Sequence, residues 1–401
     1  MEISFIIIPV DTNGEHSERI NEIRSLTESA GAEVAGHLCV KINRIVPATY
    51  IGSGKASEIK SMCEELNCDL VIFDGDLTPS QTLNLSEALG DIKVIDRTTL
   101  ILDIFASRAN SAEGKVQVEL AQLRYIYPRL KGKGSALSRL GGGIGTRGPG
   151  ESKLESDRRH IRRRINYLEE RLLELEKRRQ LQGERRTKNG VLKISLIGYT
   201  NTGKSTLLNV LTGSDVLAEN KLFATLDPTT RKLDLGEFTV LLSDTVGFIK
   251  NIPTTLIEAF KSTLETAVES DLVLIVCDAL TDWPIQLDTT NSMLDELNCT
   301  ANRLLVFNKC ENITDFSQYP SEAIFISAKE KKGLGGLILK IRSYFETNYT
   351  KLNLVIPYSK LSVFHSLQNY IENSSLEYCN DCLKAEIIVN NKFRNRFDIF
   401  K

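Results

Sequence analysis

The sequence predicts an α/β multidomain protein, and the order of its apolar patterns is the reason. Short apolar runs alternate with helical stretches over residues 1–112 and again over 189–351. Between them, residues 113–188 carry apolar side chains at helical spacing. Residues 352–401 mix short apolar runs with one helical stretch. We expect an N-terminal α/β domain, an antiparallel helical hairpin, a second α/β domain and a small C-terminal α+β domain.

Composition limits the functions that the chain can have. Its 401 residues are too many for one core and suit two to four domains. A formal net charge of −2 gives no global attraction to nucleic acid, so such binding needs a local basic patch. No apolar run approaches the roughly 20 residues of a membrane span, and the start, MEISFIIIPV, lacks the features of a signal peptide. We expect a cytoplasmic protein that is monomeric in solution.

The N-terminal segment offers strands but no obvious catalytic group. Its expected strands are SFIIIPV, LCVKINRI, DLVIFDG and IKVID. The stretch GSGK at 52–55 lacks the full spacing of a phosphate-binding loop, and we interpret it as a surface turn. The four histidines of the whole chain form no cluster in the sequence, so none is assigned to catalysis.

Matching apolar seams predict the hairpin. One seam recurs at spacings of 4, 3, 4 and 3, and the residues that form it are Val116, Leu120, Leu123, Tyr127 and Leu130. The same spacing returns after a glycine-rich stretch, in Ile161, Ile165, Leu168, Leu172 and Leu175. Two helices with such seams can pack against each other, which leaves GGGIGTRGPGES, at 141–152, as the tip. The alternative is two helices that dock separately.

Positive charge concentrates at this tip. Residues 129–164 contain eleven basic and three acidic side chains, a local net charge of +8. Helices stabilised by surface ion pairs usually mix signs, whereas DRRHIRRR does not. We therefore expect contacts with the phosphates of RNA. The candidate RNA-binding residues are Lys131, Lys133, Arg139, Arg147, Lys153, Arg158, Arg159, Arg162 and Arg163.

The strongest motif follows the hairpin. An apolar run over 191–197 leads into GYTNTGKS and then an amphipathic helix, which is GxxxxGK[ST] in a strand–loop–helix context. Amides of 201–206 would hold the β-phosphate, Lys204 would reach the β- and γ-phosphates, and Ser205 would ligate Mg²⁺. The candidate loop residues are Gly198, Tyr199, Thr200, Asn201, Thr202, Gly203, Lys204, Ser205 and Thr206.

Two later segments fit the switches of a nucleotide-dependent protein. FTVLLSDTVGF is an apolar strand that ends in Asp244, which can hold Mg²⁺ through a water. The amide of Gly247 can donate to the γ-phosphate, a contact that is lost on hydrolysis. Thr245 and Val246 lie between them. An earlier stretch, LFATLDPTTRKL, offers Thr225, Thr229 and Thr230 as a metal-binding threonine, and spacing alone does not choose among them.

Two further strand ends predict a guanine pocket. LLVFNKCE ends in Asn308, Lys309, Cys310 and Glu311, and IFISAK ends in Ser327, Ala328 and Lys329. The asparagine would meet the purine edge, the lysine stem would pack on the ring, and the alanine amide would face O6. A carboxylate would accept from N1–H and the 2-amino group, which adenine cannot match. Together the four segments predict a P-loop GTPase domain over 189–351.

Two residues depart from what guanine binding and fast hydrolysis need. The carboxylate position is Glu311 rather than an aspartate, and the extra methylene moves its oxygens by about 1.5 Å unless the loop adjusts. Phe248 follows Gly247, where a glutamine could orient the attacking water. We expect slow intrinsic hydrolysis that a partner stimulates.

One cysteine pair deserves a metal test. Cys379 and Cys382 form a CxxC, but no second pair or histidine cluster completes the roughly four ligands of a zinc site. We expect all eight cysteines to be free thiols.

The chain as a whole resembles the HflX family, in the Obg–HflX group of translation-associated GTPases. The resemblance rests on long stretches, chiefly YIGSGKASEI, DLTPSQTLNLSEAL, VIDRTTLILDIFASRANSAEGKVQVELAQLRY, GGGIGTRGPGESKLE, GYTNTGKSTLLN, LFATLDPTTR and DTVGFI. It implies binding to the large (50S) ribosomal subunit, with the hairpin tip in ribosomal RNA. It also implies action on stalled or idle ribosomes, by splitting or rescue, or a role in subunit biogenesis.

The resemblance also assigns residues. It implies that Thr225 is the switch threonine and a Mg²⁺ ligand beside Ser205. The neighbouring nucleotide contacts would be Phe223, Ala224, Thr225, Leu226 and Asp227. Lys204, Thr225 and Gly247 would then act on the reacting phosphate. Members typically carry aspartate where this chain has Glu311. Two alternatives stay open: an assembly factor with a structural nucleotide, and an ATP-dependent RNA remodeller that uses the N-terminal domain.

Overall fold

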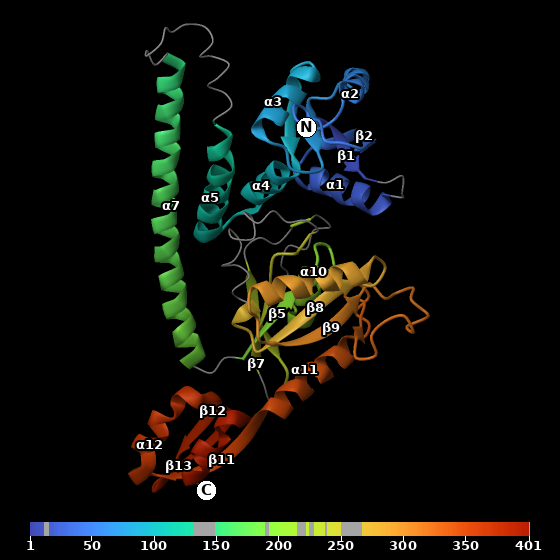
Figure 1. Ribbon diagram of the computed structural model, residues 1–401. Helices are drawn as coiled ribbons and strands as arrows, with labels where there is room; N and C mark the ends of the chain where they lie inside the picture. Colours follow the sequence, from blue (N-terminus) through green and yellow to red (C-terminus); the bar gives the residue numbers. More distant parts are fainter. Residues whose placement is uncertain are drawn as a thin grey trace. The chain divides into compact units, whose positions relative to one another are not determined.

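The computed structural model describes residues 1–11, 16–130, 149–188, 192–214, 222–223, 228–236, 239–249 and 267–400 (Figure 1). The chain divides into two compact units. The first contains residues 1–173, 219–226 and 251–260, and the second contains 174–218, 227–250 and 261–401. Three separate sheets and a helical middle region confirm the predicted α/β multidomain fold class.

Four parallel strands form the sheet of the first unit, in the order β2-β1-β3-β4. They are β1 (Ile3–Val10), β2 (Glu33–Lys41), β3 (Leu70–Phe73) and β4 (Lys93–Asp96). Parallel neighbours need crossover connections, which are α1 (Ser17–Ser29), α2 (Ser53–Glu65) and α3 (Pro79–Ala88). Side chains alternate along β1. Phe5 and Ile7 join a core cluster with residues of α2 and α3, whereas Ile6 and Ile8 are buried on the opposite face.

The GSGK stretch is not the surface turn that the sequence suggested. Gly52 is the N-cap of α2, with φ −68° and ψ 153°, and the next three residues form the first turn of the helix. Lys55 then pairs with Glu58 one turn later, at 2.7 Å. The stretch follows the helical path because its extended N-cap and its i,i+3 ion pair both favour a helix start.

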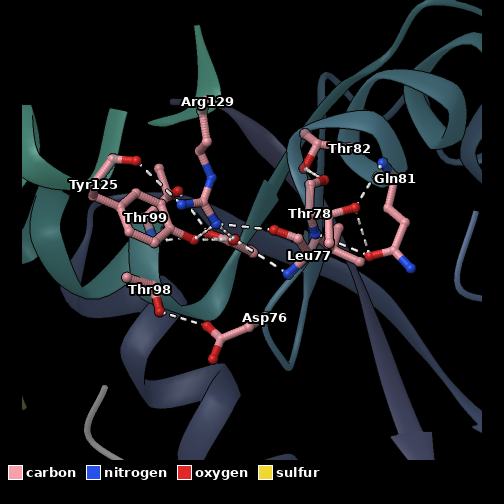
Figure 2. A network of polar contacts seen from close by, with 10 residues as sticks. Asp76, Leu77, Thr78, Gln81, Thr82, Thr98, Thr99, Tyr125 and Arg129 are labelled. Carbon is pink, nitrogen blue, oxygen red and sulfur yellow. Dashed lines mark hydrogen bonds and ion pairs between the residues drawn. The ribbon is translucent and has the colours of Figure 1, made fainter. Parts of the chain in front are cut away.

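A buried carboxylate joins this sheet to the hairpin. Asp96 ends β4 and caps the next helix, accepting from the Thr99 amide at 2.9 Å. Its other oxygen accepts from the Tyr125 hydroxyl and from Arg129, the latter at 3.2 Å. Arg129 also donates to the Leu77 carbonyl at 2.9 Å, as Figure 2 shows. Because Arg129 is the last residue of its helix, this contact fixes the end of that helix on the sheet.

The hairpin lies within the middle of the chain. Its helices are α5 (Ala112–Arg129), which follows α4 (Arg97–Arg108), and the long α7 (Pro149–Lys188). They run antiparallel, as predicted (Figure 1). The seam residues are buried or half-buried, with Leu120 and Leu168 the most buried. Two ion pairs join the helices. Arg164 donates two hydrogen bonds to the Glu119 carboxylate, at 2.7 and 2.9 Å, and Arg124 pairs with Glu169 at 2.8 Å.

The second unit holds a six-stranded sheet in the order β10-β9-β8-β5-β7-β6. Its strands are β5 (Leu192–Ile197), β6 (Thr229–Asp234), β7 (Thr239–Asp244), β8 (Leu272–Asp278), β9 (Asn302–Asn308) and β10 (Ile324–Phe325). All neighbours are parallel except β6 and β7. Its described helices are α8 (Lys204–Thr212), α10 (Trp283–Glu296) and α11 (Leu334–Asn348). The carboxyl ends of the parallel strands therefore meet along one edge.

A smaller antiparallel sheet completes the chain, in the order β11-β13-β12. It consists of β11 (Tyr349–Pro357), β12 (Ile371–Tyr378) and β13 (Cys382–Asn390). The short helices are η2 (Tyr358–Lys360), α12 (Leu361–Ser366), η3 (Gln368–Tyr370) and η4 (Asn391–Phe400). Cys379 and Cys382 face each other across the turn between β12 and β13, where the Cys379 amide donates to the Cys382 carbonyl at 2.9 Å. All eight cysteines are free thiols.

Removing the Asp96 carboxylate should open the joint between sheet and hairpin. We expect Asp96→Ala to lower the free energy of opening of α4 and α5 by about 3–5 kcal/mol, because a partly buried arginine loses its charge partner. Glu119→Ala breaks an exposed pair and should cost under about 1 kcal/mol. Hydrogen exchange of the amides in both helices measures the two losses. Equal losses would show that Asp96 is not the joint.

Candidate functional site

A strained glycine loop links β5 to α8. Gly198 has φ +152°, and a Cβ there would lie 2.1 Å from the Val276 carbonyl oxygen. Asn201 and Gly203 also have positive φ, at 62° and 88°. Only glycine tolerates the first of these positions, because the backbone of β8 lies so close. Residues of positive φ thus alternate with residues of negative φ before α8, an arrangement that can turn successive amides toward an anion at the N-terminus of the helix.

Lys204 lies at the start of α8. It is buried, and its amine donates to the carbonyls of Gly198 and Tyr199 at 3.1 and 2.8 Å. Burial lowers the pKa of Lys204 to about 8, although Asp244 and Cys277 act in the opposite direction. Two carbonyl dipoles do not replace the hydration that an ammonium loses on burial. A phosphate would supply the missing negative charge.

Two oxygen ligands suited to Mg²⁺ lie together, one in the first turn of α8 and the other at the end of β7. The Ser205 hydroxyl donates to the Asp244 carboxylate at 2.6 Å, and Asp244 is fully buried. A hydroxyl and a carboxylate are hard donors, and Mg²⁺ commonly binds through one or two such groups together with phosphates. No group of three or more His, Cys, Asp or Glu side chains that could hold a metal exists among the described residues. Because Mg²⁺ commonly takes further ligands from phosphates, the Ser205–Asp244 pair fits a metal that is shared with a nucleotide.

The second switch segment is bridged to the loop. Phe248 donates its amide to the Gly198 carbonyl at 3.1 Å, and its carbonyl accepts from the Thr200 amide at 2.7 Å. A Cβ at Gly247 would lie 2.8 Å from the Thr200 Cα and 2.9 Å from the Lys204 amine. Glycine is required here because the second switch segment, the phosphate-binding loop and the Lys204 amine meet at this point. The Phe248 side chain is buried and has no polar atom that could orient a water.

Asn308 connects the loop to the expected base pocket. Its side chain is buried, donating to the Thr202 carbonyl at 2.8 Å and accepting from the Ala328 amide at 2.9 Å. The sequence predicted that the asparagine meets the purine edge and that the Ala328 amide faces O6. In this structure the two groups bind each other, since burial requires each polar atom to find a partner, and their contacts with a base stay a prediction.

The carboxylate of the expected pocket is held in place. The Ser327 hydroxyl donates to Glu311 at 2.6 Å, and this bond lowers the pKa of the Glu311 carboxyl. Glu311 is therefore ionised at neutral pH, as an acceptor for N1–H must be. Cys310, next to it, points back to the Phe307 carbonyl at 3.2 Å, and burial raises its thiol pKa to about 11. Lys329 is exposed.

Sequence reasoning missed one residue of this pocket. Asp278 ends β8 and pairs with the Lys309 amine at 2.6 Å, which orients the lysine stem. The signal was available, because LVLIVCD is an apolar strand that ends in an acid. Adjacent parallel strands bring that acid beside the end of β9.

The predicted first switch segment is described only in part. Ala224, Thr225, Leu226 and Asp227 lie outside the described residues. Phe223 packs its ring on Phe105, with centroids 4.6 Å apart, and the preceding Leu222 amide donates to Ser29 at 3.0 Å. Of the alternative threonines, Thr229 begins β6, and the Thr230 hydroxyl pairs with that of Ser243 at 2.8 Å. The structure therefore gives no reason to prefer either as a metal ligand.

The basic residues of the hairpin divide into two groups. Arg159, Arg162 and Arg163 are exposed on α7, and Arg158 is half-buried with its guanidinium 5.3 Å from the Tyr127 ring. Arg129 and Arg164, which also counted toward the +8 charge, are instead committed to Asp96 and Glu119. Outside the described residues lie Lys131, Lys133, Arg139 and Arg147, as does the side chain of Lys153.

No described helix is both long and apolar enough to cross a membrane.

Comparisons with known proteins cover most of the chain. Residues 17–106 match the family "GTP-binding GTPase N-terminal", residues 108–186 match "GTP-binding GTPase Middle Region", and residues 193–309 match "50S ribosome-binding GTPase". A GTPase HflX from Caldanaerobacter subterraneus subsp. tengcongensis is 49% identical over 90% of this chain and 85% of its own. One from Alkalihalophilus pseudofirmus is 50% identical over 82% and 78%.

A solved structure has a related fold. The crystal structure of SsGBP in complex with GDP matches with a TM-score of 0.52 and 26% identity. The match covers 86% of this chain and 98% of that one. The two relatives and the three family models confirm the resemblance inferred from the motifs.

Nucleotide affinity should depend on the charge of Lys204. With a pKa of about 8 in the free protein, the lysine loses its proton above pH 8, whereas a bound phosphate favours the charged form. GDP affinity should therefore be flat below pH 8 and fall about tenfold from pH 7 to pH 9. Fluorescence titration with a labelled GDP measures this.

The Lys204→Met variant is the control, because titration of the nucleotide itself affects both proteins. It should bind more weakly and lose the extra fall above pH 8. A wild-type affinity for GDP that stays constant to pH 9 would contradict a lowered pKa of the buried Lys204.

Proposed function

The chain belongs to the HflX family of GTPases, and we propose that it binds GTP with Mg²⁺, hydrolyses it and uses the cycle to associate with the large ribosomal subunit. One observation carries the nucleotide part of this proposal. Lys204, the Ser205–Asp244 pair and the Asn308–Glu311 segment lie at the carboxyl ends of neighbouring strands in one sheet. That edge is where open α/β sheets bind ligands.

The residues divide the work along the nucleotide. The loop amides and Lys204 hold the phosphates, and the Gly247 amide donates to the γ-phosphate. Ser205 and Asp244 would hold Mg²⁺, which neutralises charge on the phosphate oxygens when bound. Glu311, kept ionised by Ser327, accepts from the two guanine donors while the Lys309 stem lies along the ring. Thr225 is proposed as the second metal ligand on the resemblance alone.

Hydrolysis in the isolated protein should be slow. Phe248 occupies the position from which a polar side chain would orient water, and it is buried. A partner that reorders the switches can raise such a rate by about 10³ to 10⁵ in other systems. The ribosome is the partner that the family suggests.

The hairpin is the part proposed to meet RNA. Three arginines on one side of α7 are exposed, while the arginines that hold the hairpin together are paired with carboxylates. Exposed arginines can bind backbone phosphates without breaking a structural contact. We propose that the protein acts on stalled or idle ribosomes, by splitting or rescue, or in subunit biogenesis, and that it works as a monomer.

Sedimentation with ribosomes tests the switch. The wild-type protein should co-sediment with the large subunit in a non-hydrolysable GTP analogue and remain in the supernatant with GDP. Lys204→Ala should abolish this difference, since it removes the charge that holds the phosphates. Dissociation of whole ribosomes by the analogue form would support splitting. Identical association of wild type and variant in every nucleotide would instead favour an assembly factor with a structural nucleotide.

Competition binding tests the guanine pocket. We expect GTP and GDP to displace a labelled GDP far better than ATP does. Glu311→Gln should weaken GDP binding by at least about tenfold and leave ATP binding unchanged, because only guanine donates to this carboxylate. Glu330→Gln is the matched control, an exposed acid three residues after Ser327 that pairs with Lys332. Equal affinity of the wild type for ATP and GTP would overturn the guanine assignment.

A further inference from the structure

The third residue of the phosphate-binding loop carries a hydroxyl that local structure does not explain. Thr200 is 7% exposed, and its Oγ1 is fully buried without a hydrogen-bond partner among the described residues. Leaving a buried hydroxyl unpaired costs about 1–3 kcal/mol. The other buried threonine of the loop has no such problem, since the Thr202 hydroxyl donates to the Tyr199 carbonyl at 3.0 Å.

The surroundings of Thr200 place it beside the reacting end of the site. Its amide donates to the Phe248 carbonyl at 2.7 Å, so its backbone is fixed. A Cβ on Gly247 would lie 2.9 Å from the Thr200 Cγ2 and also 2.9 Å from the Lys204 amine. The Thr200 methyl, Gly247 and the Lys204 amine therefore meet at one point, and the Thr200 hydroxyl branches from the same Cβ as that methyl. Gly247 and Lys204 are the groups proposed to contact the γ-phosphate.

We propose that Thr200 is a further catalytic residue of GTP hydrolysis, whose hydroxyl donates a hydrogen bond to a γ-phosphate oxygen. This rests on the proposed nucleotide site. The hydroxyl keeps its proton throughout. Water attacks the γ-phosphorus and its proton passes to a phosphate oxygen, while the bond between that phosphorus and the GDP oxygen breaks to leave GDP and inorganic phosphate. The hydrogen bond stabilises negative charge on the phosphoryl oxygens. GDP lacks the γ-phosphate, so the bond also distinguishes GTP from GDP.

Phosphoryl chemistry suits a threonine in this place. Phosphate oxygens are acceptors only, so a hydroxyl can always orient its proton toward them. A donor that is already dehydrated and is carried by a fixed backbone needs little rearrangement when charge develops in the transition state.

Two substitutions separate the hydroxyl from the shape of the side chain. Thr200→Val removes the hydroxyl at nearly equal volume, and Thr200→Ser retains it. In the full-length protein, we expect Thr200→Val to slow single-turnover GTP hydrolysis by about 10- to 100-fold, the range for one hydrogen bond to a charged group. GDP affinity should stay within about twofold, and Thr200→Ser should recover most of the rate.

Thr290→Val is the matched control, because Thr290 is also buried but donates its hydroxyl to the Gln286 carbonyl of its own helix at 2.7 Å. It should hydrolyse GTP at the wild-type rate. The proposal is overturned if Thr200→Val also hydrolyses at that rate, or if it loses GDP and GTP affinity equally. Absence of GTP binding by the wild-type protein would remove the proposed site itself, which is a different result.

Discussion

The nucleotide-binding part of this molecule depends on one buried positive charge that has lost most of its hydration. Lys204 is buried at the start of α8, where its ammonium is met by two backbone carbonyls rather than by a carboxylate at hydrogen-bond distance. Water cannot reach it well, and its pKa falls accordingly. The loop around it can keep this arrangement because Gly198 lies against the backbone of β8. The buried charge therefore favours binding of an anion, and the rest of the site positions that anion.

Asn308 extends this organisation from the phosphates to the base. One end of its amide holds the loop through Thr202 and the other holds the Ala328 amide, so a single buried side chain spans the strand ends of β5, β9 and β10. A base that shifts Ala328 must therefore affect the loop as well. Two hydrogen bonds of one side chain therefore join the phosphate end of the pocket to its base end.

Much of this arrangement could be predicted from the sequence, because it follows local rules. The seams of α5 and α7 follow helical periodicity, and the loop, switch and pocket motifs each follow an apolar strand. What failed depends on pairing across the fold. The sequence counts Arg129 and Arg164 as free positive charge, whereas the structure neutralises both with distant carboxylates. The Asp278–Lys309 pair was missed for the same reason, since the strand order that joins them is not visible in one dimension. The GSGK stretch was misjudged because turn composition and helix N-caps share the same residues.

The joint at Asp96 has a mechanical consequence. Arg129 attaches the final turn of α5, rather than its first turn, to the carboxyl end of the N-terminal sheet. A helix that is held at its last turn cannot bend along its length when force acts on the chain beyond it, whereas a helix held only at its first turn can. Force applied to the chain beyond Arg129 would therefore pass into β4 and α4 through a carboxylate–guanidinium contact, and not be absorbed along α5. The N-terminal domain then supports the hairpin against such a force.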